Sequence, residues 1–117
     1  MKKKLLQNKS QAFAVRIIKF YKYLCSKNEF VLGKQILKSG TSIGANIRES
    51  RNAQSTSDFI SKMNIALKEA DETQYWIEIL YASDIINQTE FEAINNDLKE
   101  LIALLTSSIK TLKKKQN

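Results

Sequence analysis

Apolar residues recur along the chain at alternating steps of three and four positions, which is the spacing of one face of an α-helix. Four segments, at about residues 10–27, 29–52, 57–83 and from 89 onward, show this pattern. Their apolar stripes are Phe13, Ile17, Phe20 and Leu24; Ile36, Gly40, Ile43 and Ile47; Phe59, Met63, Ala66, Ala70, Thr73, Ile77 and Leu80; and Phe91, Ile94, Leu98, Leu101, Leu105 and Leu112. The pattern predicts four amphipathic helices.

Polar residues between the stripes predict where the helices begin. Asn28 is placed to cap the second helix, and Ser57 with Asp58 suits the start of the third. Thr89 followed three residues later by Glu92 has the pattern of a capping box, which predicts the start of the fourth helix. Short connections between four amphipathic helices predict an all-α, antiparallel, up-down-up-down four-helix bundle.

The composition supports a single helical domain over residues 1–117. The chain has no proline and only three glycines, which argues against a β-sandwich or barrel with many tight turns. Its only cysteine, Cys25, excludes an intrachain disulfide. No apolar leader follows the first lysines, and Glu78 and Asp84 interrupt the apolar stretch 77–86. We therefore expect a cytoplasmic protein that does not span a membrane.

The charge of the chain is concentrated at its ends. There are 19 basic and 12 acidic residues, which give a net charge of +7. Two lysine triplets, Lys2–Lys4 and Lys113–Lys115, account for most of the excess, so the body of the chain is close to neutral. We expect the triplets to form short, solvated basic tails.

Basic residues outside the triplets are candidates for phosphate contacts, especially if an oligomer repeats them. The candidate nucleic-acid-binding residues are Arg16, Lys19, Lys22, Lys34, Lys38, Arg48 and Arg51. Lysine and arginine bind phosphates electrostatically, with little sequence preference and with a strong dependence on salt. An ordinary solvated helix face would explain the same residues.

Gly40 and Gly44 lie one turn apart within the second predicted helix. Each glycine costs a helix about 1 kcal/mol relative to alanine, so the pair needs a structural reason. Close packing against a neighbouring helix is one such reason. A phosphate-binding loop is the other, but the Gly-Lys-Ser/Thr ending and the preceding strand of such a loop are missing. The pattern favours packing.

Polar residues border the apolar stripes of the second and third helices. They are Ser39, Ser42, Asn46 and Glu49 on the second helix, and Lys62, Glu69, Glu72 and Thr73 on the third. Because buried polar groups must be paired, this spacing predicts a hydrogen-bond network between helices. A small ligand pocket at the same place is the alternative interpretation.

The residue types argue against catalysis. The chain has no histidine, which removes the usual general base and the commonest metal ligand. Glu69 and Glu72 have the spacing of ligands in carboxylate-bridged metal sites, but no imidazole completes the set. Cys25 lies near the end of a predicted helix, where the dipole disfavours a thiolate. We expect no enzyme activity, no cofactor and no metal.

Further apolar residues flank two of the stripes. On the first helix these are Ala14, Ile18, Tyr21 and Cys25, and on the third they are Tyr75, Trp76 and Ile79. A wide core would explain them, but Trp and Tyr are also favoured in interfaces. The candidate oligomer-interface residues are Ile18, Tyr21, Tyr75, Trp76 and Ile79.

The segment Phe30–Ile47, with its string Ser-Gly-Thr-Ser-Ile-Gly-Ala-Asn-Ile from Ser39, carries a family resemblance. Together with residues 58–60, 66–70 and 72–76, it resembles the four-helix-bundle proteins encoded by intervening sequences of bacterial 23S rRNA genes. The resemblance covers nearly the whole chain. It implies a helical bundle that forms a homo-oligomer, commonly a pentamer, without a known reaction.

A related branch of this family, the accessory proteins of diversity-generating retroelements, works with a reverse transcriptase and binds nucleic acid. The resemblance therefore implies RNA or DNA as a partner, and a reverse-transcriptase-like protein as another. Arg48 and Arg51 depart from the common pattern of small or neutral residues and add positive charge. We expect a non-enzymatic, nucleic-acid-associated adaptor, with a protein-only scaffold as the alternative.

Overall fold

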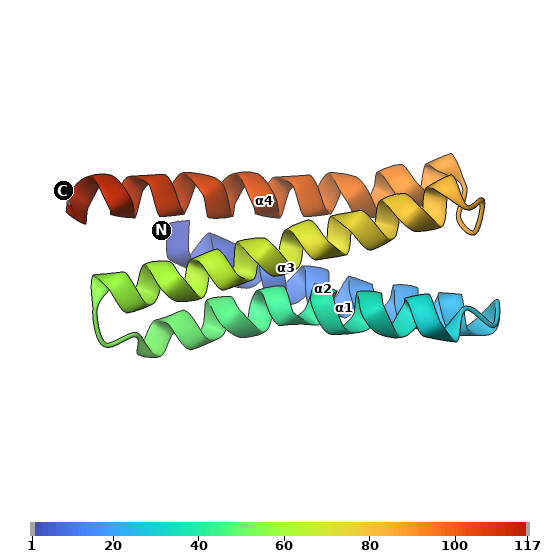
Figure 1. Cartoon of the computed structure of the whole chain (residues 1–117), viewed down its shortest axis with the longest axis horizontal. Helices are drawn as coiled ribbons and strands as arrows, with labels where there is room; N and C mark the ends of the chain where they lie inside the picture. The colour runs from blue at the N-terminus through green and yellow to red at the C-terminus, as the bar shows by residue number, and fades with distance from the viewer. Residues whose placement is uncertain (1, 117) are drawn as a thin grey trace.

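The computed structural model describes residues 2–116, which form four long helices and one short 3-10 turn (Figure 1). The helices are α1 (Lys2–Ser26), α2 (Phe30–Glu49), α3 (Thr56–Ala82) and α4 (Gln88–Gln116), and the 3-10 turn η1 (Ser50–Asn52) follows α2. Successive helices run back and forth along a body of 48 × 22 × 20 Å. Each of the four helices packs against two others: α1 with α2 and α4, and α3 with α2 and α4. This arrangement confirms the predicted all-α four-helix bundle.

The predicted stripes meet along the axis of the bundle. Ile17, Ile43, Ile77 and Leu98, one from each helix, have no exposed surface. Of the four aromatic residues of the stripes, Phe13 is buried, whereas Phe20, Phe59 and Phe91 are only half-buried at the edge of the core, as is Leu112. Burial of these stripes supplies the main driving force for folding, because removal of apolar surface from water is favourable.

Helix α1 begins at Lys2, so the predicted start near Ser10 is wrong. Leu6 is 1% exposed and extends the core stripe by almost two turns toward the N-terminus. The pattern was obscured because the residue between Leu6 and Phe13 on this face is Ser10, which is polar but buried. Its hydroxyl donates a hydrogen bond to the carbonyl of Gln7 at 3.1 Å, which satisfies it within the helix.

The two lysine triplets lie inside helices. Lys3 and Lys4 belong to the first turn of α1, and Lys113–Lys115 belong to the last turn of α4. A positive charge stabilises a helix near its C-terminal end and destabilises it near its N-terminal end. Only the second triplet therefore interacts favourably with the helix dipole. The described lysines of both triplets are exposed, and the expectation of short, solvated basic ends stays a prediction.

Asn28 ends α1 and does not cap α2, which corrects the prediction. Its φ of 63° is left-handed, and its N–H donates to the carbonyl of Cys25 at 3.0 Å. The N–H of Glu29 donates to the carbonyl of Leu24 at 2.9 Å, which completes a Schellman motif. Asp84, with φ of 61°, ends α3 in the same way. Asn and Asp tolerate this conformation better than most residues, which explains both turns without glycine.

The caps of α3 and α4 lie two residues before the predicted positions. Ser55, rather than Ser57, caps α3 by accepting a hydrogen bond from the N–H of Asp58 at 3.0 Å. At α4 the capping box is formed by Asn87 and Glu90, whose side chains each accept from the other's backbone N–H at 2.8 Å. The predicted Thr89 and Glu92 box is wrong because Asn87 is an equally good cap and comes first.

We expect replacement of Asn87 by alanine to destabilise the bundle by about 1 kcal/mol, because the N–H of Glu90 loses its acceptor at the helix start. Thermal unfolding followed by circular dichroism measures the effect. Thr89→Ala is the matched control and should change stability by less than about 0.5 kcal/mol, because Thr89 is exposed and makes no capping bond. An equal loss in both variants would contradict the assignment of the cap.

Candidate functional site

Three glycines bring α1 and α2 into close contact along one face. A Cβ atom on Gly40 would lie 2.8 Å from Cγ1 of Ile17, and one on Gly44 would lie 3.3 Å from the carbonyl oxygen of Ser10. A Cβ atom on Gly33, nearer the other end of α2, would lie 3.3 Å from the ring of Tyr21. The two helices therefore form one continuous surface, and the side chains that flank the glycines share it.

A groove of about 420 Å³ lies on this surface between α1 and α2. Its lining consists of small, amide and basic side chains and contains no carboxylate. The lining residues are Gln7, Asn8, Ser10, Gln11 and Ala14 of α1, and Thr41, Gly44, Ala45, Arg48 and Arg51 of α2 and η1. We refer to it as the α1–α2 groove.

Arg48 and Arg51 are the only charged residues of the α1–α2 groove. They lie about one turn apart, at the end of α2 and in η1. Within residues 2–116, neither guanidinium forms an ion pair or a hydrogen bond with a protein group. The nearby carboxylate of Glu49 instead faces α3, where it lies 3.9 Å from the ammonium of Lys62. Both guanidinium groups remain available to an anionic partner.

The seven predicted nucleic-acid-binding residues do not lie on one surface. Arg16 lies on the α4 side of α1 and forms an ion pair with Asp97. Lys38 is close enough to Glu69 to offset part of the rise that burial causes in the pKa of that carboxyl. The other three lysines, Lys19, Lys22 and Lys34, are exposed. Arg16 is therefore separated from the groove and already paired, whereas Arg48 and Arg51 come together.

One buried hydrogen bond links α2 to α3. The hydroxyl of Thr73 lies 2.9 Å from that of Ser39, and both residues are fully buried. Thr73 also lies within hydrogen-bond distance, 2.8 Å, of the carbonyl of Glu69. These polar groups are satisfied at the centre of the bundle, where an unpaired hydroxyl would be costly.

Of the other predicted network residues, Glu49 and Lys62 form an ion pair between α2 and α3, whereas the remaining ones bond within their own helices or on the surface. Ser42 donates to the carbonyl of Lys38 at 2.6 Å, and Asn46 donates to the carbonyl of Ser42 at 2.8 Å, so both bond within α2. Glu72 accepts from the ring N–H of Trp76 at 3.4 Å on the surface of α3. Partial burial, and to a smaller degree the charge of Glu72, raises the pKa of Glu69. A ligand pocket at this place stays a prediction.

A polar contact between α3 and α4 was not predicted. Gln74 donates from its amide to the amide oxygen of Asn95 at 3.2 Å, and Asn95 is 6% exposed. The position of Asn95, next to Ile94 and three residues before Leu98, marks it as a core-facing residue in retrospect. The apolar pattern missed it because a polar residue on that face interrupts the stripe.

The predicted interface residues differ in their exposure. Tyr75 is 54% and Ile18 is 42% exposed. Tyr21, Trp76 and Ile79 are half-buried, and the rings of Tyr75 and Trp76 are in edge-to-face contact at 5.1 Å. The most exposed large apolar residue described, Val31 at 76%, was not predicted.

Residues 2–116 contain neither a cluster of metal-ligating side chains nor a membrane-spanning helix. Within residues 2–116, no three carboxylate, thiolate or imidazole side chains gather where they could hold a metal ion. No helix in the same range combines the length and the apolar character needed to cross a bilayer.

Comparison with known proteins defines the family. The family described as 23S rRNA-intervening sequence protein matches residues 2–107 of the chain. The chain belongs to this family. This confirms the resemblance carried by the segment Phe30–Ile47. The link to retroelement accessory proteins stays a prediction.

A solved structure supports the same assignment. It is the crystal structure of a protein of unknown function from the S23 ribosomal protein family of Bacteroides thetaiotaomicron VPI-5482. It shares 56% sequence identity and superposes with a TM-score of 0.92, and the similarity covers 94% of this chain and 99% of that one. The comparison with curated proteins gives no match. This member of the 23S rRNA-intervening sequence family is therefore similar, in both fold and sequence, to a protein of unknown function.

Proposed function

We propose that this 23S rRNA-intervening sequence protein is a non-enzymatic, homo-oligomeric adaptor that binds nucleic acid through phosphate contacts in the α1–α2 groove. The observation that carries the proposal is the position of Arg48 and Arg51. Their unpaired guanidinium groups come from positions about one helical turn apart, along a groove that no carboxylate of residues 2–116 lines. Such a groove attracts an anion and has no internal group to compete for the arginines.

The chemistry of the groove suits a phosphodiester backbone. Guanidinium groups bind phosphate oxygens through paired N–H donors, and the amides of Gln7, Asn8 and Gln11 offer further donors to phosphate and sugar oxygens. These contacts do not read base edges, so binding should be largely independent of sequence. Lys22 and Lys34, both exposed, add positive charge to the same pair of helices.

Oligomerisation would place several copies of a weak binding site on one assembly. The exposed side chains of Ile18, Val31 and Tyr75 support a homo-oligomer, because their burial between subunits would be favourable. The family resemblance favours a pentamer. Repeated grooves on one assembly would bind a single strand or duplex with an avidity well above that of one groove.

Binding of the purified protein to labelled RNA and duplex DNA across a salt series tests the proposal. We expect binding at micromolar or lower protein concentration that weakens steeply as salt increases, because counterions are released from the phosphates. The mass of the free protein, measured by light scattering in the same buffers, should exceed that of a monomer. Absence of binding at about 50 mM salt would overturn the nucleic-acid part of the proposal. A monomer mass at micromolar concentration would overturn the oligomeric part.

A protein-only scaffold is the second candidate. The observation that favours it is the set of exposed apolar side chains, which suit contacts with protein better than contacts with phosphate. A stable oligomer that binds neither RNA nor DNA at low salt would be the result expected of such a scaffold.

A further inference from the structure

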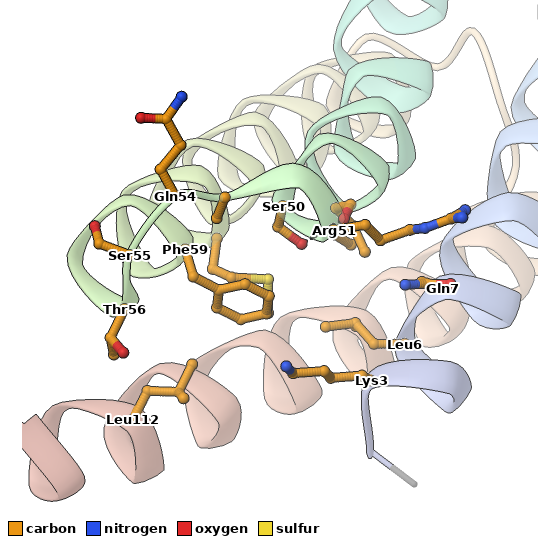
Figure 2. A pocket seen from close by; sticks show the side chains of 13 residues that line it. Lys3, Leu6, Gln7, Ser50, Arg51, Gln54, Ser55, Thr56, Phe59 and Leu112 are labelled. Carbon is orange, nitrogen blue, oxygen red and sulfur yellow. Dashed lines mark hydrogen bonds between the residues drawn. The ribbon is translucent and has the colours of Figure 1, made fainter.

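A second cavity lies at the end of the bundle where η1 and the connection to α3 cross between helices (Figure 2). Its volume is about 490 Å³, which is the size of a typical small-molecule pocket. The first turn of α1, the end of α2, the start of α3 and the end of α4 all contribute to it. We refer to it as the end pocket.

The charged residues of the end pocket are both cationic. They are Lys3 and Arg51, and no carboxylate of residues 2–116 lines the cavity. Asp58, the acidic residue in the first turn of α3, lies outside the lining. Its carboxylate accepts a hydrogen bond from the N–H of Gln54 at 3.2 Å. Figure 2 shows Arg51 extending toward Gln7 of α1, so the guanidinium lies at the rim.

Two serine side chains at the rim already have partners. The hydroxyl of Ser50 donates to the carbonyl of Ile47 at 2.5 Å, and that of Ser55 accepts from the N–H of Asp58 at 3.0 Å. Lys3 and Arg51 have no ion pair among the described residues. A negatively charged group would therefore form the strongest new interaction at the rim, with Lys3 and Arg51.

The floor of the end pocket is apolar. It is formed by Leu6, Ile47, Met63, Phe59 and Leu112. Figure 2 shows the ring of Phe59 projecting into the cavity, and the ammonium of Lys3 lies 4.5 Å from the centre of that ring. The ammonium of Lys3 therefore lies at the boundary between the cationic rim and the apolar floor.

The apolar floor continues toward α4. A narrower cavity of about 120 Å³ shares Lys3, Phe59 and Leu112 with the end pocket and reaches Ser108 and Thr111. Its exposed lining is almost entirely apolar. A bound molecule could place apolar carbon beyond the ring of Phe59 while its charged end remains near Lys3 and Arg51.

We propose that the end pocket binds a small amphipathic anion, with one carboxylate, phosphate or sulfonate group at the rim that Lys3 and Arg51 line and an apolar body against Phe59 and Leu112. Charge complementarity selects an anion, and the apolar floor selects a carbon body over an inorganic ion. This site goes beyond the proposed nucleic-acid contacts. Arg51 borders both cavities, but Arg48 lines only the α1–α2 groove and Phe59 only the end pocket and its extension.

Calorimetric titration with octanoate tests the site, with octylamine as a probe of the same length and opposite charge. We expect heat of binding and saturation with octanoate only. Arg51→Gln should weaken octanoate binding about tenfold, since a charge-assisted contact is lost. Lys3→Gln should weaken it as well, and it provides a second charge variant if Arg51→Gln does not fold. Inorganic phosphate, which lacks the apolar body, should compete poorly.

Two further variants separate this site from the proposed function. Leu112→Ala, at a half-buried position, should weaken octanoate binding and leave RNA binding unchanged. Arg48→Gln should weaken RNA binding and leave octanoate binding unchanged. Equal binding of octanoate and octylamine, no binding of octanoate, or the same loss in Arg48→Gln as in Arg51→Gln would overturn the proposal. Saturable octanoate binding without RNA binding would uphold the end pocket while the nucleic-acid proposal fails.

Discussion

Replacement of Gly40 by alanine should destabilise the protein by about 2 kcal/mol, although alanine is the better helix former. The new Cβ atom would lie 2.8, 2.9 and 3.0 Å from three carbon atoms of the Ile17 side chain. Ile17 is fully buried, so it cannot move away without disturbing the core. The cost of overpacking then exceeds the gain in helix propensity.

Chemical denaturation followed by circular dichroism measures this effect, provided that the slope of the transition is unchanged. Gly33→Ala is the matched control in the same helix. Its Cβ atom would lie 3.3 Å from the ring of Tyr21, which is only half-buried and free to shift. We expect it to be neutral or stabilising by up to about 1 kcal/mol.

A compensating variant makes the test specific to the contact. Ile17→Ala in the Gly40→Ala background removes all three carbon atoms that the new Cβ atom would meet, so the double variant should lose less stability than the sum of the two single losses. A Gly40→Ala variant as stable as the wild type, or a double variant whose losses simply add, would show that Gly40 is not required for the approach of α1 and α2.

Reversal of charge at Arg48 and Arg51 should lower affinity for RNA about a hundredfold at low salt, because two phosphate contacts are lost and two repulsive charges are introduced. The slope of log affinity against log salt should fall by about 2, roughly one unit for each contact. This prediction rests on the proposed function. Fluorescence anisotropy with the Arg48→Glu, Arg51→Glu double variant measures both quantities.

The control for net charge is the double variant Lys99→Glu, Lys110→Glu. Both lysines are exposed on α4, away from the α1–α2 groove, and the change in total charge is the same. It should retain most of the affinity. If both double variants lose binding to the same extent, only the overall charge matters and the groove has no special role.

The helical periodicity was sufficient to predict the four helices and their buried faces. Ile36, Ile43 and Ile47 repeat at helical spacing, and no proline interrupts any of the four stripes. The apolar stripe of an amphipathic helix is removed from water by packing against another such stripe. Short connections require neighbouring helices to be antiparallel. Four such stripes therefore indicate a bundle before any contact is known. The role of Gly40 in close packing was also predictable, because glycine is costly in a helix unless a neighbour needs the space.

The ends of the helices were less predictable because several residues compete for each cap. Asn28 has the side chain of an N-cap and the backbone freedom of a C-terminal residue, and the contacts of α1 give it the second role. Asn87 and Thr89 are both good caps, and the chain uses the first. Differences between such alternatives amount to about 1 kcal/mol, which tertiary packing easily outweighs.

Local periodicity establishes which residues share a helix face, but it cannot establish which charges on different helices meet. Arg16 and Arg48 were equal candidates in the sequence, yet packing places Arg16 beside Asp97 and leaves Arg48 beside Arg51. The end pocket likewise joins Lys3, Arg51 and Leu112, which are far apart in the chain. The physical reason is that helix formation depends on neighbours within a turn, whereas a binding site depends on distances between helices that only the packed core sets.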